Sequence, residues 1–120
     1  MEYYIAFFIT MVLLVLVDMI WLGTVGLISL KMLEKIQGSA VTMRFWAAAI
    51  VYVALAYLVL EAKTIYQAAG IGAASYAVYD FTNLATLEKY DWRLAIADTV
   101  WGGVLFSIVW KIMNIVTKSL

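Results

Sequence analysis

Residues 3–30 read YYIAFFITMVLLVLVDMIWLGTVGLISL, an apolar run that one charged residue, Asp18, interrupts. A helix that crosses the hydrocarbon core of a bilayer needs about 20 mostly apolar residues, so this run predicts a membrane-spanning helix. The run continues far past the length of the apolar part of a signal peptide, and no basic stretch precedes it. We therefore expect this segment to be kept as the first span.

The whole chain of 120 residues is unusually apolar. Hydrophobic residues make up 67% of it and charged residues only 13%, whereas an average soluble domain contains about 45–50% and 25%. A soluble chain this short has too much surface to hide so much apolar material. Eight basic residues balance eight acidic ones, so no strongly basic surface indicates a nucleic-acid partner. The composition predicts that the partner is the lipid bilayer.

Three further apolar runs follow the first and are separated by polar segments. We expect spans at approximately residues 3–30, 45–60, 65–87 and 94–116, with an amphipathic loop at 31–44. Asp91 lies in the last turn, where its side chain is suited to cap the final helix. The prediction is an all-α, polytopic membrane protein that forms a single four-transmembrane-helix bundle over residues 1–120.

Basic residues are unevenly distributed between the two sides of this predicted bundle. The first and third loops contain five of them: Lys31, Lys35, Arg44, Lys89 and Arg93. The opposite side contains three: Lys63, Lys111 and Lys118. The positive-inside rule then predicts a multi-pass protein with loops one and three in the cytoplasm and both termini outside.

Four aromatic residues occupy the ends of the predicted spans: Trp46, Tyr66, Tyr90 and Trp92. Amphipathic rings prefer the boundary between the hydrocarbon core and water. We therefore interpret all four as interfacial anchors.

Asp18, Asp80 and Asp98 are the residues that are hardest to explain as simple parts of spans. An uncompensated carboxylate near the bilayer centre costs several kcal/mol, from about 2.5 upward. Asp80 precedes Lys89 by nine residues and Asp98 follows it by nine, so a hairpin centred there places both about 13 Å from the turn. Asp18 precedes Ser29 by eleven residues, which is a comparable depth. The three carboxyls are predicted to converge in one layer.

Polar but uncharged side chains accompany the aspartates on their helices. The residues that complete the candidate proton, cation or ligand site are Asn83, Tyr76, Tyr79, Thr82, Trp21 and Trp101. Carboxyls this close together in a dry site cannot all stay ionised, so we expect one or two to carry a proton near neutrality. The cluster could hold a proton, share one, or bind a cation in its place. Alternatively, the protonated acids only join helices through hydrogen bonds.

Residues 18–23, DMIWLG, and 98–103, DTVWGG, share the pattern D-x-x-W-x-G. The first and last predicted helices run in opposite directions, so one interpretation is an inverted relationship of the kind found in transporters. The other interpretation is chance or a shared packing requirement.

The same residues carry a family resemblance. Residues 79–87, YDFTNLATL, resemble the Y-D-x-T-N-L-A-T-L signature of a family of small membrane proteins, domain of unknown function 2177. Residues 97–102, ADTVWG, resemble its D-x-x-W-G motif in the last helix, and residues 17–23, VDMIWLG, resemble its first-helix motif. The resemblance covers the whole chain. It implies a four-span membrane protein and brings no established activity.

Three classes of function are consistent with these residues. The first is proton- or cation-coupled transport or conduction through the aspartates, in a homo-oligomer, because four helices enclose little of a pathway. The second is an accessory or structural membrane subunit whose acids only pack helices. The third is a lipid-binding or lipid-modifying membrane enzyme, in which aspartate and Asn83 oxygens coordinate a divalent cation such as magnesium. No Arg or Lys lies beside the acids to clamp a phosphate. The sequence therefore favours a non-enzymatic role and predicts no cofactor.

Overall fold

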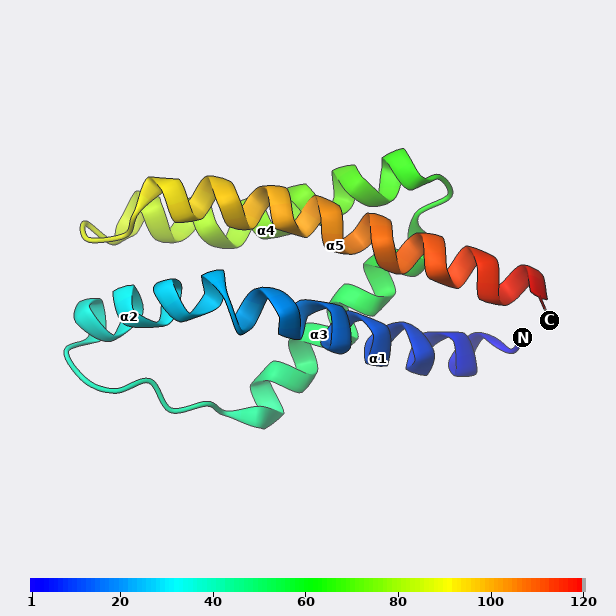
Figure 1. Ribbon diagram of the computed structural model, residues 1–120, viewed down its shortest axis with the longest axis horizontal. Helices are drawn as coiled ribbons and strands as arrows, with labels where there is room; N and C mark the ends of the chain where they lie inside the picture. The colour runs from blue at the N-terminus through cyan, green and yellow to red at the C-terminus, as the bar shows by residue number, and fades with distance from the viewer. Residues whose placement is uncertain (120) are drawn as a thin grey trace.

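The computed structural model describes residues 1–119, and all the regular structure in this range is helical. It consists of α1 (Tyr3–Leu22), α2 (Val25–Gln37), α3 (Phe45–Glu61), α4 (Ile65–Thr86) and α5 (Trp92–Ser119). The all-α prediction is confirmed. Figure 1 shows α4 and α5 as a long hairpin, α1 beside it and α3 crossing obliquely, with both termini at the same end.

Two of these helices are long and apolar enough to cross a membrane. They are α1 and the Trp92–Lys118 part of α5, and α3 is a shorter apolar helix of 17 residues. Large apolar side chains cover the outside of the molecule, and Phe8, Phe45 and Val78 are each more than 60% exposed. An outer surface of this kind is suited to lipid.

The expected first span at residues 3–30 is wrong, because the helix ends at Leu22. The Thr24 N–H bonds to the carbonyl three residues back, on Trp21, and the Thr24 hydroxyl donates to Ile20 O at 2.8 Å. Thr24 therefore has non-helical backbone angles, φ −124° and ψ −92°. Back-bonding of this kind competes with the helical ladder and bends or breaks a helix.

The expected loop at residues 31–44 is also wrong over its first half, where α2 continues to Gln37. Its end is set by Gly38, which adopts the left-handed conformation (φ 79°) and donates its N–H to Glu34 O. Glycine tolerates this conformation because it has no Cβ. Lys31 and Lys35 are both exposed. α2 extends from the end of α1 toward the tip of the α4–α5 hairpin, and residues 38–44 then return the chain to α3 (Figure 1).

The hairpin of α4 and α5 is the most extensive contact between helices. Its two backbones approach closely where Gly72 faces Gly102 and the rings of Phe106 and Tyr76 cover the glycines. Small residues allow such an approach, and dispersion contacts between helices then replace the missing hydrophobic drive. Leu105, Phe106 and Val109 of α5 are fully buried and form the core together with Leu14 of α1 and Val59 of α3.

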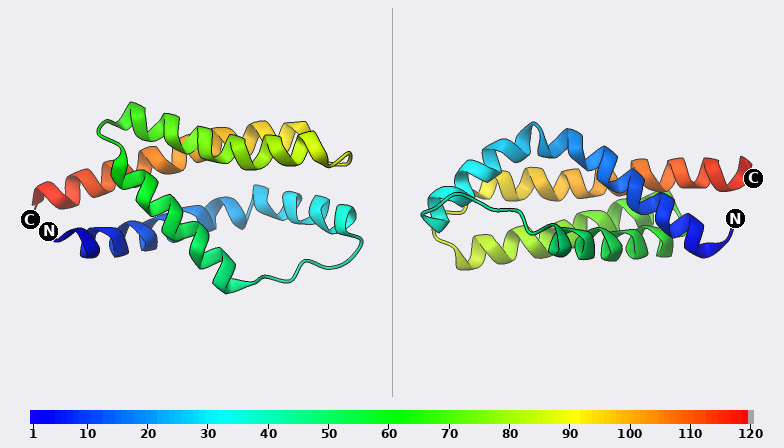
Figure 2. Two further views of the ribbon diagram at one scale, coloured as in Figure 1. Left: turned by 180° about the vertical axis from the view of Figure 1, so that it is seen from behind. Right: turned by 90° about the horizontal axis from the view of Figure 1, so that it is seen from below.

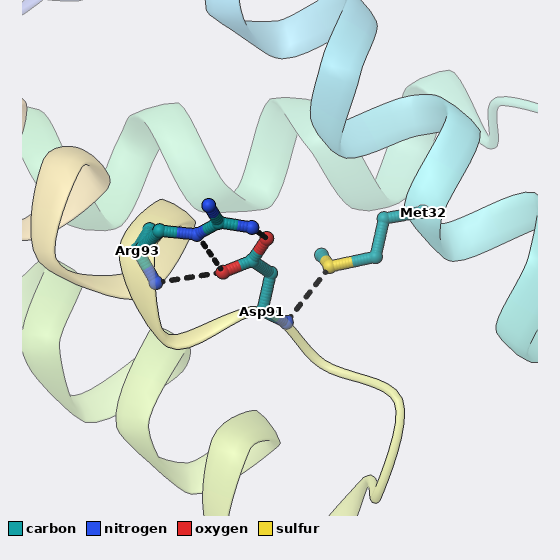
Figure 3. Close-up of polar contacts among 3 residues, drawn as sticks. All are labelled: Met32, Asp91 and Arg93. Carbon is teal, nitrogen blue, oxygen red and sulfur yellow. Dashed lines mark hydrogen bonds and ion pairs between the residues drawn. The ribbon is translucent and has the colours of Figure 1, made fainter.

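The tip of the hairpin is held by Asp91, as Figure 3 shows. The Asp91 side chain accepts a hydrogen bond from the Arg93 backbone N–H at 2.9 Å and forms an ion pair with the Arg93 guanidinium at 3.0 Å. The predicted helix cap is thus confirmed. The Asp91 N–H donates to Met32 Sδ at 3.1 Å, so the tip also contacts α2.

Gly72→Ala should destabilise the protein, because a Cβ at this position would lie 2.6 Å from Phe106 Cγ. Forcing extra atoms into a packed contact costs about 1–3 kcal/mol. Gly70→Ala is the matched control in the same helix, since nothing lies within 4 Å of its added Cβ. Thermal unfolding in detergent should show a lower Tm for the first variant only. Equal Tm values would contradict the close contact.

The Asp91 carboxyl should contribute a pH dependence to stability. Hydrogen bonds from the Arg93 side chain and then from its backbone N–H hold the pKa of Asp91 below its usual value of 3.8. A carboxyl with a lowered pKa in the folded protein stabilises it above the unfolded pKa, and this contribution is lost as the pH falls through the folded pKa. When the pH is lowered from about 6 to about 3, the Tm of Asp91→Asn should therefore fall less than the Tm of the wild type. Parallel curves would show that the contact is absent in solution.

Candidate functional site

Helices α4 and α5 place two of the aspartates at one level. Asp80 precedes the end of α4 by six residues and Asp98 follows the start of α5 by six, so each lies about 9 Å inside the hairpin tip. Asp18 joins them from α1, four residues before that helix ends. Asp18 is 6% exposed and Asp80 2%, and Asp98 is partly buried. The structure thus brings the three carboxyls together.

α1 and α5 exchange hydrogen bonds through their tryptophans. Trp101 Nε1 donates to Asp18 Oδ1 at 2.8 Å, and Trp21 Nε1 donates to Asp98 Oδ1 at 3.0 Å. The two indoles stack with centroids 5.1 Å apart and planes 4° from parallel. In an antiparallel pair, moving three residues along one helix moves three residues back on the other. Both bonds therefore belong to one register, and the repeated D-x-x-W spacing makes the exchange reciprocal.

Asp18 has a second donor from α3. The Tyr52 hydroxyl donates to Asp18 Oδ2 at 2.5 Å, so both carboxyl oxygens of Asp18 accept a bond, each from a different helix. Inside a bilayer, where water does not compete, a hydrogen bond between helices contributes about 0.6–2 kcal/mol. Asp18 consequently joins α1, α3 and α5.

Asp80 has a different environment. The Tyr90 hydroxyl donates to its Oδ1 at 2.7 Å, but Oδ2 is buried and meets no donor within residues 1–119. The Asp98 carboxyl faces that of Asp80. Two ionised carboxylates are both acceptors, so a bond between them forms only when one of the two carries a proton.

Tyr90 is one of two functional residues that sequence reasoning missed. It is 7% exposed, and its interpretation as an interfacial anchor is wrong because its hydroxyl is directed inward to Asp80. Burial, followed by the hydrogen bond to Asp80, raises the pKa of Tyr90, so the hydroxyl remains a donor. Trp46, Tyr66 and Trp92 are exposed, as anchors would be.

Tyr52 is the other missed residue, and the sequence contained a signal for it. It lies in the middle of the apolar run of α3, and a hydroxyl packed among apolar side chains needs a hydrogen-bond partner. Its spacing indicated no particular aspartate, so only the packing of α3 against α1 identifies Asp18 as that partner.

The remaining predicted site residues divide into two groups. Tyr76 is partly buried beside Gly102, and Asn83 lies near the Tyr79 and Tyr90 hydroxyls. These residues surround the acids. Thr82 is exposed and lies outside this network.

A cavity of about 390 Å³ opens beside the acids. Figure 2 shows α3 and α4 diverging from the short connection between them, with α1 and α5 behind. The cavity is lined by residues of these four helices: Asp18, Trp21, Leu22, Val51, Leu55, Ser75, Tyr76, Tyr79 and Asp98. It is an apolar, aromatic pocket with two carboxyls in its wall.

No basic side chain compensates the acids. Among the described residues the one ion pair is that of Arg93 and Asp91 at the hairpin tip, and Lys111 is exposed on the distal part of α5. In the same range, no three His, Cys, Asp or Glu side chains are grouped in a way that could hold a metal ion.

A protein family matches most of the chain. The family described as "Predicted membrane protein (DUF2177)" matches residues 3–114. No curated protein and no solved structure matches the chain.

The bond between Trp101 and Asp18 should appear as a coupling energy. We expect the effects of Trp101→Phe and Asp18→Ala on the free energy of unfolding to be non-additive by about 0.5–2 kcal/mol, because each substitution removes the hydrogen-bond partner of the other side chain. Unfolding in mixed detergent micelles measures all four proteins of the cycle.

Trp110→Phe provides the matched control, because Trp110 is on the same helix but donates to Ala62 O at 2.9 Å. Its cycle with Asp18→Ala should be additive within about 0.5 kcal/mol. Additivity in both cycles would show that the exchange between α1 and α5 does not hold the fold.

Proposed function

The chain belongs to the DUF2177 family of predicted membrane proteins, and we propose that it is a four-span protein that performs proton- or cation-coupled transport or conduction. Its site would be the layer of Asp18, Asp80 and Asp98. The observation that supports this most directly is the Asp80–Asp98 pair, in which the buried Asp80 Oδ2 meets no donor within residues 1–119.

Four spans follow if α3 and α4 cross together with α1 and α5. α4 contains 22 residues, a length of about 33 Å that matches a hydrocarbon core of about 30 Å. It packs antiparallel along α5, so it must cross wherever α5 crosses. α3 contains 17 residues, which is at the lower limit of about 17–25 for a spanning helix.

The charges then set an orientation for the bundle. The side with α2 and the hairpin tip contains Lys31, Lys35, Arg44, Lys89 and Arg93, so this side faces the cytoplasm and both termini lie outside. The aspartate layer is near this side, about 9 Å inside the hairpin tip. Because the cavity opens sideways, a closed pathway requires further helices, and we propose that a second copy of the chain supplies them.

A proton shared by two carboxyls is a suitable carrier for coupling. Asp80 and Asp98 face each other, and a hydrogen bond between them requires that one of the two carries a proton. Ionising both would place two like charges side by side without a cation. The proton can leave only when a cation or another donor arrives to replace it. This exchange is the elementary step of proton-coupled transport.

A structural role is the second candidate, and the reciprocal bonds favour it. Asp18 has both oxygens occupied by donors from other helices, which is how an acid acts when it only joins helices. An accessory membrane subunit would need no more than this. The two candidates differ in the function of Asp80 and Asp98.

Proton flux in liposomes distinguishes them. The purified protein is reconstituted with a trapped pH dye, and potassium with valinomycin imposes a membrane potential. Proton entry by the wild type should fall at least about tenfold in Asp80→Asn and in Asp98→Asn, because an amide cannot exchange the proton.

Asp91→Asn is the control, since this partly exposed carboxyl at the hairpin tip is outside the layer. It should conduct as the wild type does. If the Asp80 and Asp98 variants are folded and retain the wild-type flux, the proton is not carried by this pair. If the wild type shows no flux, uncoupled conduction is excluded and the structural role gains support.

A further inference from the structure

We propose that the cavity between α3 and α4 binds a lipophilic organic cation, such as an amine or an onium ion that bears aromatic or alkyl groups. The inference rests on the proposed function because the same acids take part. It adds the chemical class of the ligand and the place where it is held.

The size and lining of the cavity fit such a ligand. Sites for small molecules are about 300–1,000 Å³, largely apolar, with a few polar groups that set orientation. This one measures about 390 Å³ and presents the aromatic side chains of Trp21, Tyr76 and Tyr79 with the aliphatic Val51 and Leu55. Aromatic faces attract cations as well as apolar groups.

The charge of the wall selects the sign of the ligand. Asp18 and Asp98 both line the cavity, and Asp18 is more than nine-tenths buried. No Lys or Arg is among the lining residues. An anionic headgroup or a phosphate would meet carboxyls with no counter-charge, whereas a cation would supply the charge that the acids lack.

The route of entry explains why the cation would be lipophilic. Tyr79, Val51 and Leu22 at the edge of the cavity are about half exposed, and they lie on helices that cross the bilayer in the proposed arrangement. The cavity therefore opens toward the acyl chains. A ligand that first dissolves in the lipid reaches it without crossing the aqueous surface of the protein.

Binding would be linked to the proton. The titratable groups facing Asp98 and Asp80 are Asp18 from α1, Tyr76 and Tyr79 from α4, and Tyr90 from the hairpin. Tyr52 from α3 faces Asp18. None of them carries a positive charge. A cation beside Asp98 stabilises its ionised form, so one cation enters as one proton leaves and the net charge of the site is conserved.

Tetraphenylphosphonium is the probe, titrated calorimetrically into the purified protein in a neutral detergent. We expect saturable binding whose Kd weakens at least tenfold in Asp98→Asn. Val51→Trp, which fills the cavity and leaves every acid in place, should also weaken it at least tenfold. The neutral triphenylphosphine oxide should bind the wild type more weakly than the cation does. Its affinity should be the same for the wild type and for Asp98→Asn. Circular dichroism and elution volume verify the fold of each variant.

The pH dependence tests the exchange. If one proton is released for each cation bound, a rise of one pH unit lowers Kd by up to about tenfold, over the pH range in which the pair holds its proton. Asp98→Asn should flatten this slope.

Several outcomes would overturn the inference. They are no binding of the cation to the folded wild type, equal binding to the wild type and Val51→Trp, or equal binding of the cation and the neutral probe. If proton flux still depends on Asp80 and Asp98 in that case, the proposed function stands without this ligand class. Cation binding without any proton flux would instead keep the ligand site and remove the conduction.

Discussion

The reciprocal hydrogen bonds between Trp21 and Asp98 and between Trp101 and Asp18 are the contact on which the rest of the layer depends. In hydrocarbon, a polar group that finds no partner in the protein has none at all. The exchange gives two indole N–H groups an acceptor and one oxygen of each carboxyl a donor, and it fixes the register of α1 on α5. Tyr52 can then reach Asp18 from α3, and α4 is held through its close packing on α5 at Gly72.

The three aspartates share a layer but not an environment. Asp18 is satisfied on both oxygens by donors that do not titrate near neutrality, so it can remain a fixed acceptor. Asp80 has one such donor, Tyr90, and one unpartnered oxygen. This asymmetry separates an acid that joins helices from an acid that keeps an unoccupied acceptor. The two candidate functions therefore describe different residues of one site, and both can hold.

Sequence reasoning located the acids but not their partners. Counting residues from Lys89 placed Asp80 and Asp98 at one level because the rise of a helix is constant. Which side chain each acid meets depends on how the helices rotate about their axes, and the sequence alone does not show this. The tryptophans were assigned to the polar surroundings of the acids, whereas they bond across to the other helix. The break at Gly23 and Thr24 was missed because glycine is common in membrane helices, and the backbone angles and hydroxyl bond of Thr24 reveal it in the structure.

Infrared spectroscopy of protein labelled with ¹³C-aspartate tests the central claim most directly, because the C=O stretch distinguishes a protonated carboxyl from a carboxylate. The account predicts a protonated aspartate band at neutral pH in the wild type. That band should disappear in Asp80→Asn and in Asp98→Asn, where the amide supplies the donor, and remain in Asp18→Asn. A wild type without the band, or a band that only Asp18→Asn removes, would contradict the shared proton.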